Sequence, residues 1–456
     1  MTPTRELLEF LHGLEPGRLP PDIAGAAQNC VLDTLGCALF GSPEAWSRIM
    51  AAEMIAEGSK GSSTIVGQRA MVAAPAAALC NGTAAHGFEL DDHLDEAIVH
   101  PGAIIVSAAL AAAEAAEAPG ARLLLGVVAG YEFANRLGLA MGVTPSQRGW
   151  HKTSVAGPVG AAVAVAKVMG LSADRMQCAI GLACSAASGT KAYAAGEGGG
   201  MEKRMHAGRS AEAGVRMAQL AARGFTAPPG AIEGRFGLLD VMSGDKAKPE
   251  LLAEALGARW AVGHVYIKLY PCCAWIQAAA QQLVELRGPR PLGADEVRGV
   301  RVGVSAYAKA QNGNPLPQDT MGAQFSIPYC AALALTGDPA DPAAYGEAAL
   351  ADEARRALAQ RVEIFVDPEM EAAYPRHYGA RVELQLGNGE RRTAARLDPH
   401  GMPADPCTQS ELEQKFLRLA GRVKSTGEAS RILAEVRQLH RAPGVRGLTE
   451  LLRKAE

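Results

Sequence analysis

Three histidines and a run of carboxylates lie close together between residues 81 and 114. His86, His93 and His100 lie in or beside a run of five carboxylates, which are Glu89, Asp91, Asp92, Asp95 and Glu96. The segments on either side are apolar and rich in alanine, which is typical of buried helices. A plain connection does not need so many ionisable groups. Histidine and carboxylate side chains are the usual proton-transfer groups of enzymes, so this stretch is the first candidate for a functional site.

His100 is expected at the start of a helix. It stands just before Pro101 and Gly102, and proline is favoured in the first helical turn, where its missing N–H would be unsatisfied anyway. Free backbone N–H groups and the positive end of the helix dipole meet at such a point. The position therefore suits a bound carboxylate.

The acidic part of the stretch has three interpretations. Asp91 and Asp92 beside His93 could be metal ligands, a hydrogen-bonded network that holds the histidines, or simply a solvated acidic loop. Calcium loops repeat oxygen ligands at alternate positions around a turn glycine, and zinc sites offer a tighter set of His and Cys ligands. Neither pattern is met. We therefore expect no metal ion.

Four other short segments place polar residues among apolar ones, at 149–153 (GWHKT), 202–209 (EKRMHAGR), 268–273 (KLYPCC) and 324–328 (QFSIP). His151 comes just before an apolar helix, and Lys203 and His206 begin another. Lys268 and Cys273 lie at a predicted domain boundary, where small-molecule sites preferentially form. Taken singly, these residues could be helix caps, a solvated face or core cysteines.

The shared position of three candidates at helix starts favours a functional interpretation. His100, His151 and Lys203 would present cations where helix dipoles also favour anions, which implies a small polycarboxylate ligand. The glycine-rich segment 196–200 has neither a GxGxxG nor a GK[ST] pattern, so we expect an active-site loop and no nucleotide. No GxSxG motif suggests nucleophilic hydrolysis.

Composition narrows the class of protein and its partners. The formal net charge of the 456 residues is −3, so no overall field attracts nucleic acid or an anionic membrane. The N-terminus lacks a charged segment followed by an apolar one, and glycine, proline, aspartate or histidine interrupts the apolar runs. Nine cysteines without a CxxC pair indicate reduced thiols. We expect a cytoplasmic protein without nucleic-acid or membrane partners.

The element pattern predicts a mainly α protein with an inserted α+β part. Helical periodicity covers most of residues 5 to 260, at 5–14, 21–38, 44–58, 70–86, 101–117, 121–140, 153–168, 173–187, 206–223 and 248–256, with one strand at 62–66. Strands are expected at 297–306, 362–366, 381–386 and 391–397, and helices at 274–287, 324–334 and 342–359. From Ser410 onward the sequence pattern is again typical of helices. We therefore predict a helical domain at 1–265 and 400–456, and an α+β lid domain at 266–399.

Two helix boundaries carry local signals. Gly170 and Ser172 predict a helix stop followed by a new N-cap. Ser410 with Glu413 three residues later fits a capping box. Aromatic residues make up only 5% of the chain, so small side chains must fill the core through close approach of helices.

With these residues in view, the chain resembles the MmgE/PrpD family, which contains 2-methylcitrate dehydratase, cis-aconitate decarboxylase and iminodisuccinate epimerase. The likeness runs through five ordered blocks: AAHGFELDDHLDEAIVHPGAIIVSAALAAAE, GWHKTSVAGPVGAAVAVAKVMGLSADRMQCAIGLACSAASG, EKRMHAGRSAEAGVRMAQLAARGFTAP, KLYPCCAWIQAA and QFSIPYCAALALTGD. It implies a large helical domain formed by both chain ends, a smaller lid domain, a homodimer and a site without cofactor.

The resemblance also implies roles for individual residues. His100, His151 and Lys203 match the family's active-site histidines and lysine; Asp91 and Asp92 match its paired aspartates, and Lys268 the lysine of its KxYP motif. Two positions depart from the family pattern, because His93 stands where threonine is frequent and Gln277 where histidine is frequent. Cys273 occupies the place of a further catalytic histidine of cis-aconitate decarboxylases, which argues against decarboxylation.

These observations lead to one main functional hypothesis and several alternatives. We expect a cofactor-independent lyase, similar to 2-methylcitrate dehydratase, that abstracts a proton α to a carboxylate of a small di- or tricarboxylate. His151 would be the main proton-transfer residue, His100 a second acid/base or a carboxylate binder, and Lys203 an electrostatic clamp. Asp91, Asp92, His93, Lys268, Cys273 and His206 would complete substrate binding. The alternatives are an epimerase, a cis-aconitate decarboxylase and a non-catalytic carboxylate-binding protein.

The inserted domain is expected to close over the site. Its entry near 262–264 and its exit near 399–401 each contain one glycine, so two flexible crossings could lie side by side. Closure would deliver Lys268 and the turn that follows it, and would exclude water from the reaction. A rigid pair of domains is the alternative.

Overall fold

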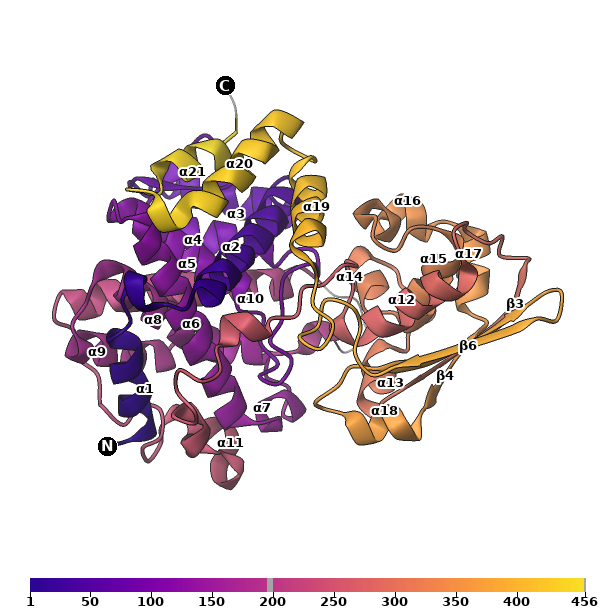
Figure 1. Ribbon diagram of the computed structural model, residues 1–456, viewed down its shortest axis with the longest axis horizontal. Coiled ribbons are helices and arrows are strands. Elements are labelled where there is room, and N and C mark those ends of the chain that lie inside the picture. Colours follow the sequence, from indigo (N-terminus) through magenta and orange to yellow (C-terminus); the bar gives the residue numbers. More distant parts are fainter. Residues whose placement is uncertain (195–199, 455–456) are drawn as a thin grey trace.

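The chain folds into a mainly helical protein, as predicted from the sequence. A computed structural model describes residues 1–194 and 200–454 (Figure 1). Of the glycine-rich segment expected to form an active-site loop, residues 196–199 lie outside this description. The main helices of the first half are α1 (Pro3–His12), α2 (Pro21–Gly41), α3 (Ala45–Ala56), α4 (Ala74–Ala85), α5 (Gly102–Ala115), α6 (Gly120–Met141), α8 (Lys152–Met169), α9 (Ala173–Cys184) and α10 (Glu202–Ala222).

Small residues allow the central helices to approach closely, as the low aromatic content predicts. Helix α8 is buried along most of its length and packs against α5, α6, α9 and α10. At Gly130 on α6, an added Cβ would lie 2.6 Å from Ile105 on α5 and 2.8 Å from Ala164 on α8. Any larger residue there would push three helices apart, because packed cores do not absorb extra volume.

Two of the core helices correct one sequence-based expectation. By length and composition alone, α2 and α6 are apolar enough to cross a membrane, whereas we expected such runs to be interrupted. Within the fold, 78% of the most apolar stretch of α2 and 89% of that of α6 are buried. Burial on most sides is the property of central helices in a packed bundle.

The C-terminal helices return to the first half of the chain. These helices are α19 (Gln409–Ala420), α20 (Thr426–Gln438) and α21 (Arg446–Leu452), and α19 and α20 pack against α2 (Figure 1). On α19, the buried Lys415 donates to the Asp33 carboxylate of α2 at 2.6 Å and to the Leu90 carbonyl at 2.7 Å. The last helices thus help to hold the acidic loop before α5.

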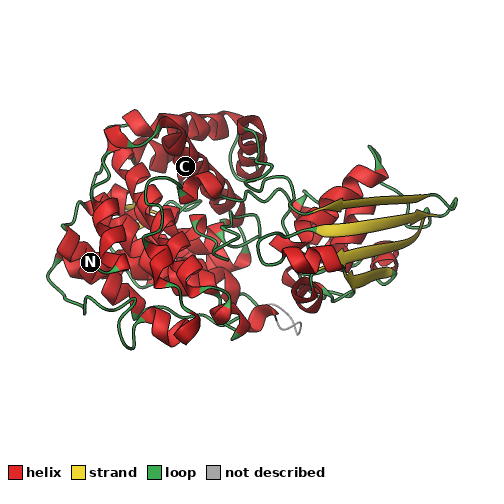
Figure 2. Ribbon diagram, turned by 60° about the horizontal axis from the view of Figure 1, so that its bottom comes forward, coloured by secondary structure: helices red, strands yellow, loops and turns green. Residues whose placement is uncertain are grey.

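Residues 266 to 402 build a second hydrophobic core around a small sheet. The strands β3 (Val297–Val304), β4 (Val362–Val366), β5 (Ala380–Leu386) and β6 (Arg391–Arg396) lie in the order β4-β3-β5-β6. β3 pairs in parallel with β4 and antiparallel with β5, with Val302 opposite both Ile364 and Val382. α12 (Ala274–Arg287) and α15 (Ile327–Thr336) contact the sheet and each other, and Figure 2 shows the sheet at the end away from the helical bundle.

The shorter helices of this part are α13 (Ala306–Asn312), α14 (Thr320–Gln324), α16 (Glu347–Leu350), α17 (Glu353–Ala359) and α18 (Pro368–Ala373). The helix predicted over 342–359 was wrong in extent. Extended backbone at Gly346 and at Asp352, whose side chain caps α17, divides it into three pieces. The helix predicted over 324–334 is likewise interrupted, because Ser326 caps α15.

Four other predicted boundaries also need correction. The helix expected at 70–86 begins at Ala74, since Met71–Val72 (β2) pairs with Ser63–Thr64 (β1). The helix expected at 248–256 is only a 3-10 turn at Pro249–Leu252. Helix α10 begins at Glu202, four residues before the predicted start. The capping box of α19 is formed by Thr408 and Glu411 instead of Ser410 and Glu413.

Candidate active site

Asp92 fastens the acidic loop between α4 and α5 to the helical core. Its Oδ1 accepts from the Gly102 backbone N–H at 2.8 Å, and its Oδ2 accepts from the Tyr131 hydroxyl at 2.6 Å. Burial, together with the charge of Asp33, raises the pKa of Asp92 to about 7. Both oxygens are used inside the protein, so the structure places this carboxylate at the start of α5, behind the site cavity.

The His100 imidazole is held in one tautomer. Its Nδ1 donates to the Asp92 carbonyl oxygen at 2.9 Å, and a carbonyl oxygen can only accept. The Asp91 carboxylate lies 3.3 Å from the same nitrogen. Burial lowers the pKa of His100 to about 3 although the charge of Asp91 acts in the opposite direction. His100 is therefore neutral at pH 7, and Nε2 keeps its lone pair.

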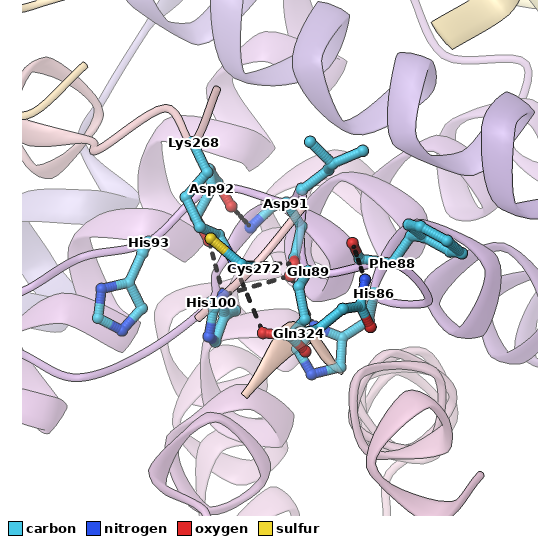
Figure 3. Close-up of polar contacts among 12 residues, drawn as sticks. His86, Phe88, Glu89, Asp91, Asp92, His93, His100, Lys268, Cys272 and Gln324 are labelled. Atoms are coloured by element: carbon cyan, nitrogen blue, oxygen red, sulfur yellow. Dashed lines mark hydrogen bonds and ion pairs between the residues drawn. The ribbon is translucent and has the colours of Figure 1, made fainter. Parts of the chain in front are cut away.

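His86, Asp91 and Lys268 form a buried network beside His100 (Figure 3). The Nδ1 atom of His86 lies 2.6 Å from Asp91 Oδ2, and Lys268 Nζ lies 3.7 Å from Asp91 Oδ1. Ligand atoms of His86, Asp91 and His100 lie within 4.8 Å of one another, a spacing that could hold a metal ion. However, both imidazole Nδ1 atoms already face the carboxylate, and an ammonium group competes for it. These side chains therefore fit a hydrogen-bonded network that holds the histidines, one of the three interpretations of the sequence, better than a metal centre.

His151 stands at the entrance of α8, as the sequence predicts. It is the N-cap residue, yet its side chain does not cap the helix. Its Nδ1 lies 2.9 Å from Nδ1 of His206 on α10. Burial lowers the pKa of His151 well below the ordinary imidazole value and that of His206 to about 4. Two neutral rings in this contact must act as one donor and one acceptor, which leaves Nε2 of His151 available.

Lys203, near the start of α10, is ion-paired with Glu89. Glu89 has a left-handed backbone with φ of 56°, which is uncommon for a residue other than glycine. Its second oxygen lies 3.8 Å from Lys268 Nζ. Burial would raise the pKa of Glu89, but the charges of Lys203 and Lys268 lower it to about 2. Lys203, which we predicted to stabilise negative charge on the substrate, is thus already paired with a carboxylate of the protein.

These groups surround one small cavity between the helical bundle and the second core. Five of the predicted site residues line it, namely His93, His100, His151, Lys203 and Cys273. The structure places the other four behind this wall, where Asp91, Asp92, Lys268 and His206 contact the lining residues. Burial raises the pKa of the Cys273 thiol to about 11, so it is neutral in the site.

The cavity also has walls that sequence reasoning did not assign. Glu89 was counted among the acidic residues without a role, and Thr153 and Phe325 lie inside the quoted motifs. Ser146, Lys191, Tyr193, Trp275 and Gln311 line the cavity as well. Of these five, Trp275 lies inside the quoted block KLYPCCAWIQAA, and no pattern in the sequence marks the other four, because tertiary packing alone brings them together.

The two unusual motif positions have clear structural roles. His93 Nδ1 lies 2.7 Å from Asp95 Oδ1, and its backbone exchanges two hydrogen bonds with Tyr266 at 2.8 and 2.9 Å. Gln277 donates to the carbonyls of Tyr270 and Cys272 at 2.7 and 2.9 Å. Gln277 therefore braces the KLYPCC turn from behind the cavity.

Two hydrogen bonds connect the inserted part to the acidic loop beside the site. Gln324 donates to the Phe88 carbonyl at 2.9 Å (Figure 3), and the Tyr378 hydroxyl donates to the Asp95 carbonyl at 3.0 Å. These bonds tie the second core to the acidic loop of the first. The site is therefore completed by residues that are more than two hundred positions apart.

Fold and site together define a mainly helical protein with a cavity lined by histidine and lysine side chains. The MmgE/PrpD N-terminal domain model matches residues 5–250, and the MmgE/PrpD C-terminal domain model matches residues 270–441. The chain belongs to the MmgE/PrpD family, which confirms the resemblance seen in the sequence.

The chain is also similar along its full length to proteins named as cis-aconitate decarboxylases or as decarboxylase-like. It is 28% identical to a cis-aconitate decarboxylase-like protein of Aspergillus oryzae, with 98% of this chain and 97% of the relative covered. Identity is 27% to cis-aconitate decarboxylase of Aspergillus terreus, with 98% and 95% covered, and 26% to that of Homo sapiens, with 99% and 94% covered. These names are those of carbon–carbon lyases.

Proposed function

We propose that this protein is a lyase that removes a proton α to a carboxylate of a small di- or tricarboxylate, with no metal or other cofactor. One observation carries the proposal: His100 and His151 face one buried cavity as neutral imidazoles beside lysine side chains. A neutral imidazole is a base, and buried ammonium groups stabilise the negative charge that develops when the proton leaves.

His151 is the proposed proton acceptor. When its Nδ1 donates to His206, the lone pair of Nε2 is free to take the proton. As the imidazolium forms, the Nδ1 proton is shared with His206, so the pair can spread the incoming charge over two rings. His206 acts here as a positioning residue behind the cavity wall.

The charge left on the substrate is that of an enediolate. Lys203 lies beside the cavity with Glu89, and aromatic rings of Tyr193 and Phe325 lie 5.5 and 5.0 Å from its Nζ. The ammonium group is held in place by these contacts before the substrate binds, so it needs little reorganisation during the reaction. Loss of a β-hydroxyl group as water, with its proton supplied by the imidazolium, would complete a dehydration, and delivery of a proton to the other face would give epimerisation.

The names of the relatives favour decarboxylation of cis-aconitate as the second candidate. In that reaction a carbon–carbon bond breaks, and the resulting carbanion must receive a proton from an acid. With lowered pKa values, His100 and His151 are present at pH 7 in the neutral form that accepts a proton. The site chemistry therefore supports proton removal as the first step.

A substrate panel tests the proposal. Purified protein would be incubated with 2-methylcitrate, citrate, cis-aconitate and iminodisuccinate, and products would be identified by NMR, before and after dialysis against a chelator. We expect dehydration of a hydroxytricarboxylate that survives chelation. Release of CO2 from cis-aconitate as the main reaction would instead establish the second candidate. Thermal stabilisation by these compounds without any turnover would favour a non-catalytic binding protein, and loss of activity with chelator would refute the metal-free version.

A further inference from the structure

Lys191 is placed in the cavity wall by a short backbone pairing with the His151 segment. The Lys191 N–H donates to the Gly149 carbonyl at 2.8 Å, and the His151 N–H donates to the Gly189 carbonyl at 2.9 Å. An antiparallel bridge between Trp150 and Thr190 lies between these two bonds. The position of Lys191 is thus coupled directly to that of the proposed base.

The Lys191 side chain reaches from the helical part to the inserted part. Its Nζ donates to the Tyr307 hydroxyl on α13 at 2.5 Å. Tyr307 is itself held by Trp275 and Tyr374, whose rings lie 5.0 and 5.4 Å away. Gln311, one turn further along α13, also lines the cavity. Lys191 and Gln311 therefore offer donors on the cavity wall, and the Tyr307 hydroxyl lies within hydrogen-bond distance of Lys191.

Lys191 differs from the other lysines of the site in its charge balance. Lys203 and Lys268 share the carboxylates of Glu89 and Asp91. The Nζ of Lys152 donates to the carbonyls of Gly138 and Gly142 at 2.8 and 2.7 Å. Within residues 1–194 and 200–454, no carboxylate lies within ion-pair distance of Lys191. It is a half-buried ammonium group in the cavity wall with a hydroxyl as its polar side-chain partner.

We propose that Lys191, together with the Tyr307 hydroxyl, binds a substrate carboxylate remote from the carbon that loses its proton. This inference rests on the proposed function and deepens it, because it makes Lys191 the residue that selects polycarboxylates over monocarboxylates. One carboxylate lies near Lys203, where charge develops, and a second is held by Lys191. A substrate with a single carboxylate can satisfy only one of these two cations.

Binding of tricarballylate and butyrate to folded variants tests the inference without requiring turnover. Isothermal titration would compare wild type with Lys191→Met, Lys191→Arg, Tyr307→Phe and the exposed control Lys246→Met. Hydrogen bonds to charged groups contribute about 1.5–3 kcal/mol, so Lys191→Met should weaken tricarballylate binding roughly 10- to 100-fold. Lys191→Arg should retain most of the affinity, Tyr307→Phe should lose less than Lys191→Met, and Lys246→Met should match wild type. The weak binding of butyrate should be unchanged by Lys191→Met.

Two results would overturn this role. One is tricarballylate binding by Lys191→Met within twofold of wild type while its thermal unfolding remains normal, and the other is no binding of tricarballylate by wild type at millimolar concentration. For any compound that the panel shows to be a substrate, Lys191→Met should raise KM and leave kcat nearly unchanged, because uniform binding is lost. Normal tricarballylate selectivity with no turnover of any panel compound would refute the proposed function and leave the Lys191 site standing.

Discussion

Neutral imidazoles set the pH range in which the proposed reaction can run. The pKa is lowered to about 3 for His100 and to about 4 for His206, and lies well below the ordinary value for His151. The basic form of each ring therefore persists as pH falls through 6.5 and is lost only at lower pH. We predict that kcat/KM, which reports the free enzyme, declines on the acid side with an apparent pKa below 6.5.

A bound polyanion favours the protonated rings and raises their pKa. The acid limb of kcat should therefore lie at higher pH than that of kcat/KM in the same pH series. An acid limb of kcat/KM at or above pH 6.5 would contradict the assignment of these histidines as buried neutral bases.

The ion pair between Lys203 and Glu89 links activity to stability at the residue scale. Both side chains are only 3% exposed, and removing one partner of a buried pair typically costs about 3–5 kcal/mol because the other charge is left uncompensated. Lys203→Met should therefore lower both turnover and the free energy of unfolding. The double variant Lys203→Met/Glu89→Gln should recover much of the stability in urea unfolding but not the activity. Recovery of both would show that Lys203 has only a structural role.

At the scale of elements, Asp92 fixes where α5 begins. Asp92→Asn keeps the shape but replaces one acceptor with a donor, so the Gly102 N–H or the Tyr131 hydroxyl loses its partner. We predict a loss of about 1–3 kcal/mol in the free energy of unfolding, measured by urea denaturation, with a smaller loss for Tyr131→Phe. A stability equal to wild type for Asp92→Asn would mean that the loop is held by its other contacts.

Local signals in the sequence predict helix ends well where only one residue can take the role. Gly170 adopts the left-handed conformation and Ser172 caps α9, both as expected. The signal is ambiguous where two residues compete: Thr408 with Glu411 and Ser410 with Glu413 have the same spacing, and only the first pair forms the capping box. Which pair wins depends on how α19 docks on α2, and the local pattern does not contain this information.

The same limit applies to the site. His100 and His151 could be placed in one cavity because each precedes an apolar helix, and that position is visible in the sequence. The direction in which Asp92 points depends on Tyr131, and the partner of Lys203 depends on the left-handed backbone of Glu89. The Lys191 wall depends on α13 from the inserted part. These features arise from packing between distant segments.

At the scale of the whole molecule, we propose that the inserted part acts as a lid. The two crossings lie side by side, because the Ile267 N–H donates to the Gly401 carbonyl at 3.0 Å. Gly401 has φ of 98°, and a Cβ there would lie 2.2 Å from the Ile267 carbonyl. Glycine is thus required where the chain returns to the helical part.

Hydrogen exchange with and without tricarballylate tests this lid. Because the ligand would contact Lys191, whose hydroxyl partner Tyr307 belongs to the inserted part, we predict increased protection of residues 262–273 and 397–403 in the bound state, with the exposed strand β6 as internal control. Equal protection of the crossings in both states would support a rigid pair of domains.

The central claim is that His151 removes a proton α to a substrate carboxylate. The most direct measurement is single-turnover kinetics with the panel substrate in its ordinary form and deuterated at the α carbon, for wild type, His151→Gln and the exposed control His12→Gln. We predict slower turnover of the deuterated substrate by wild type, and a rate roughly 10²- to 10⁴-fold lower for His151→Gln, with tricarballylate binding mostly retained. Equal rates for the two forms of the substrate, with His151→Gln as active as His12→Gln, would contradict the account.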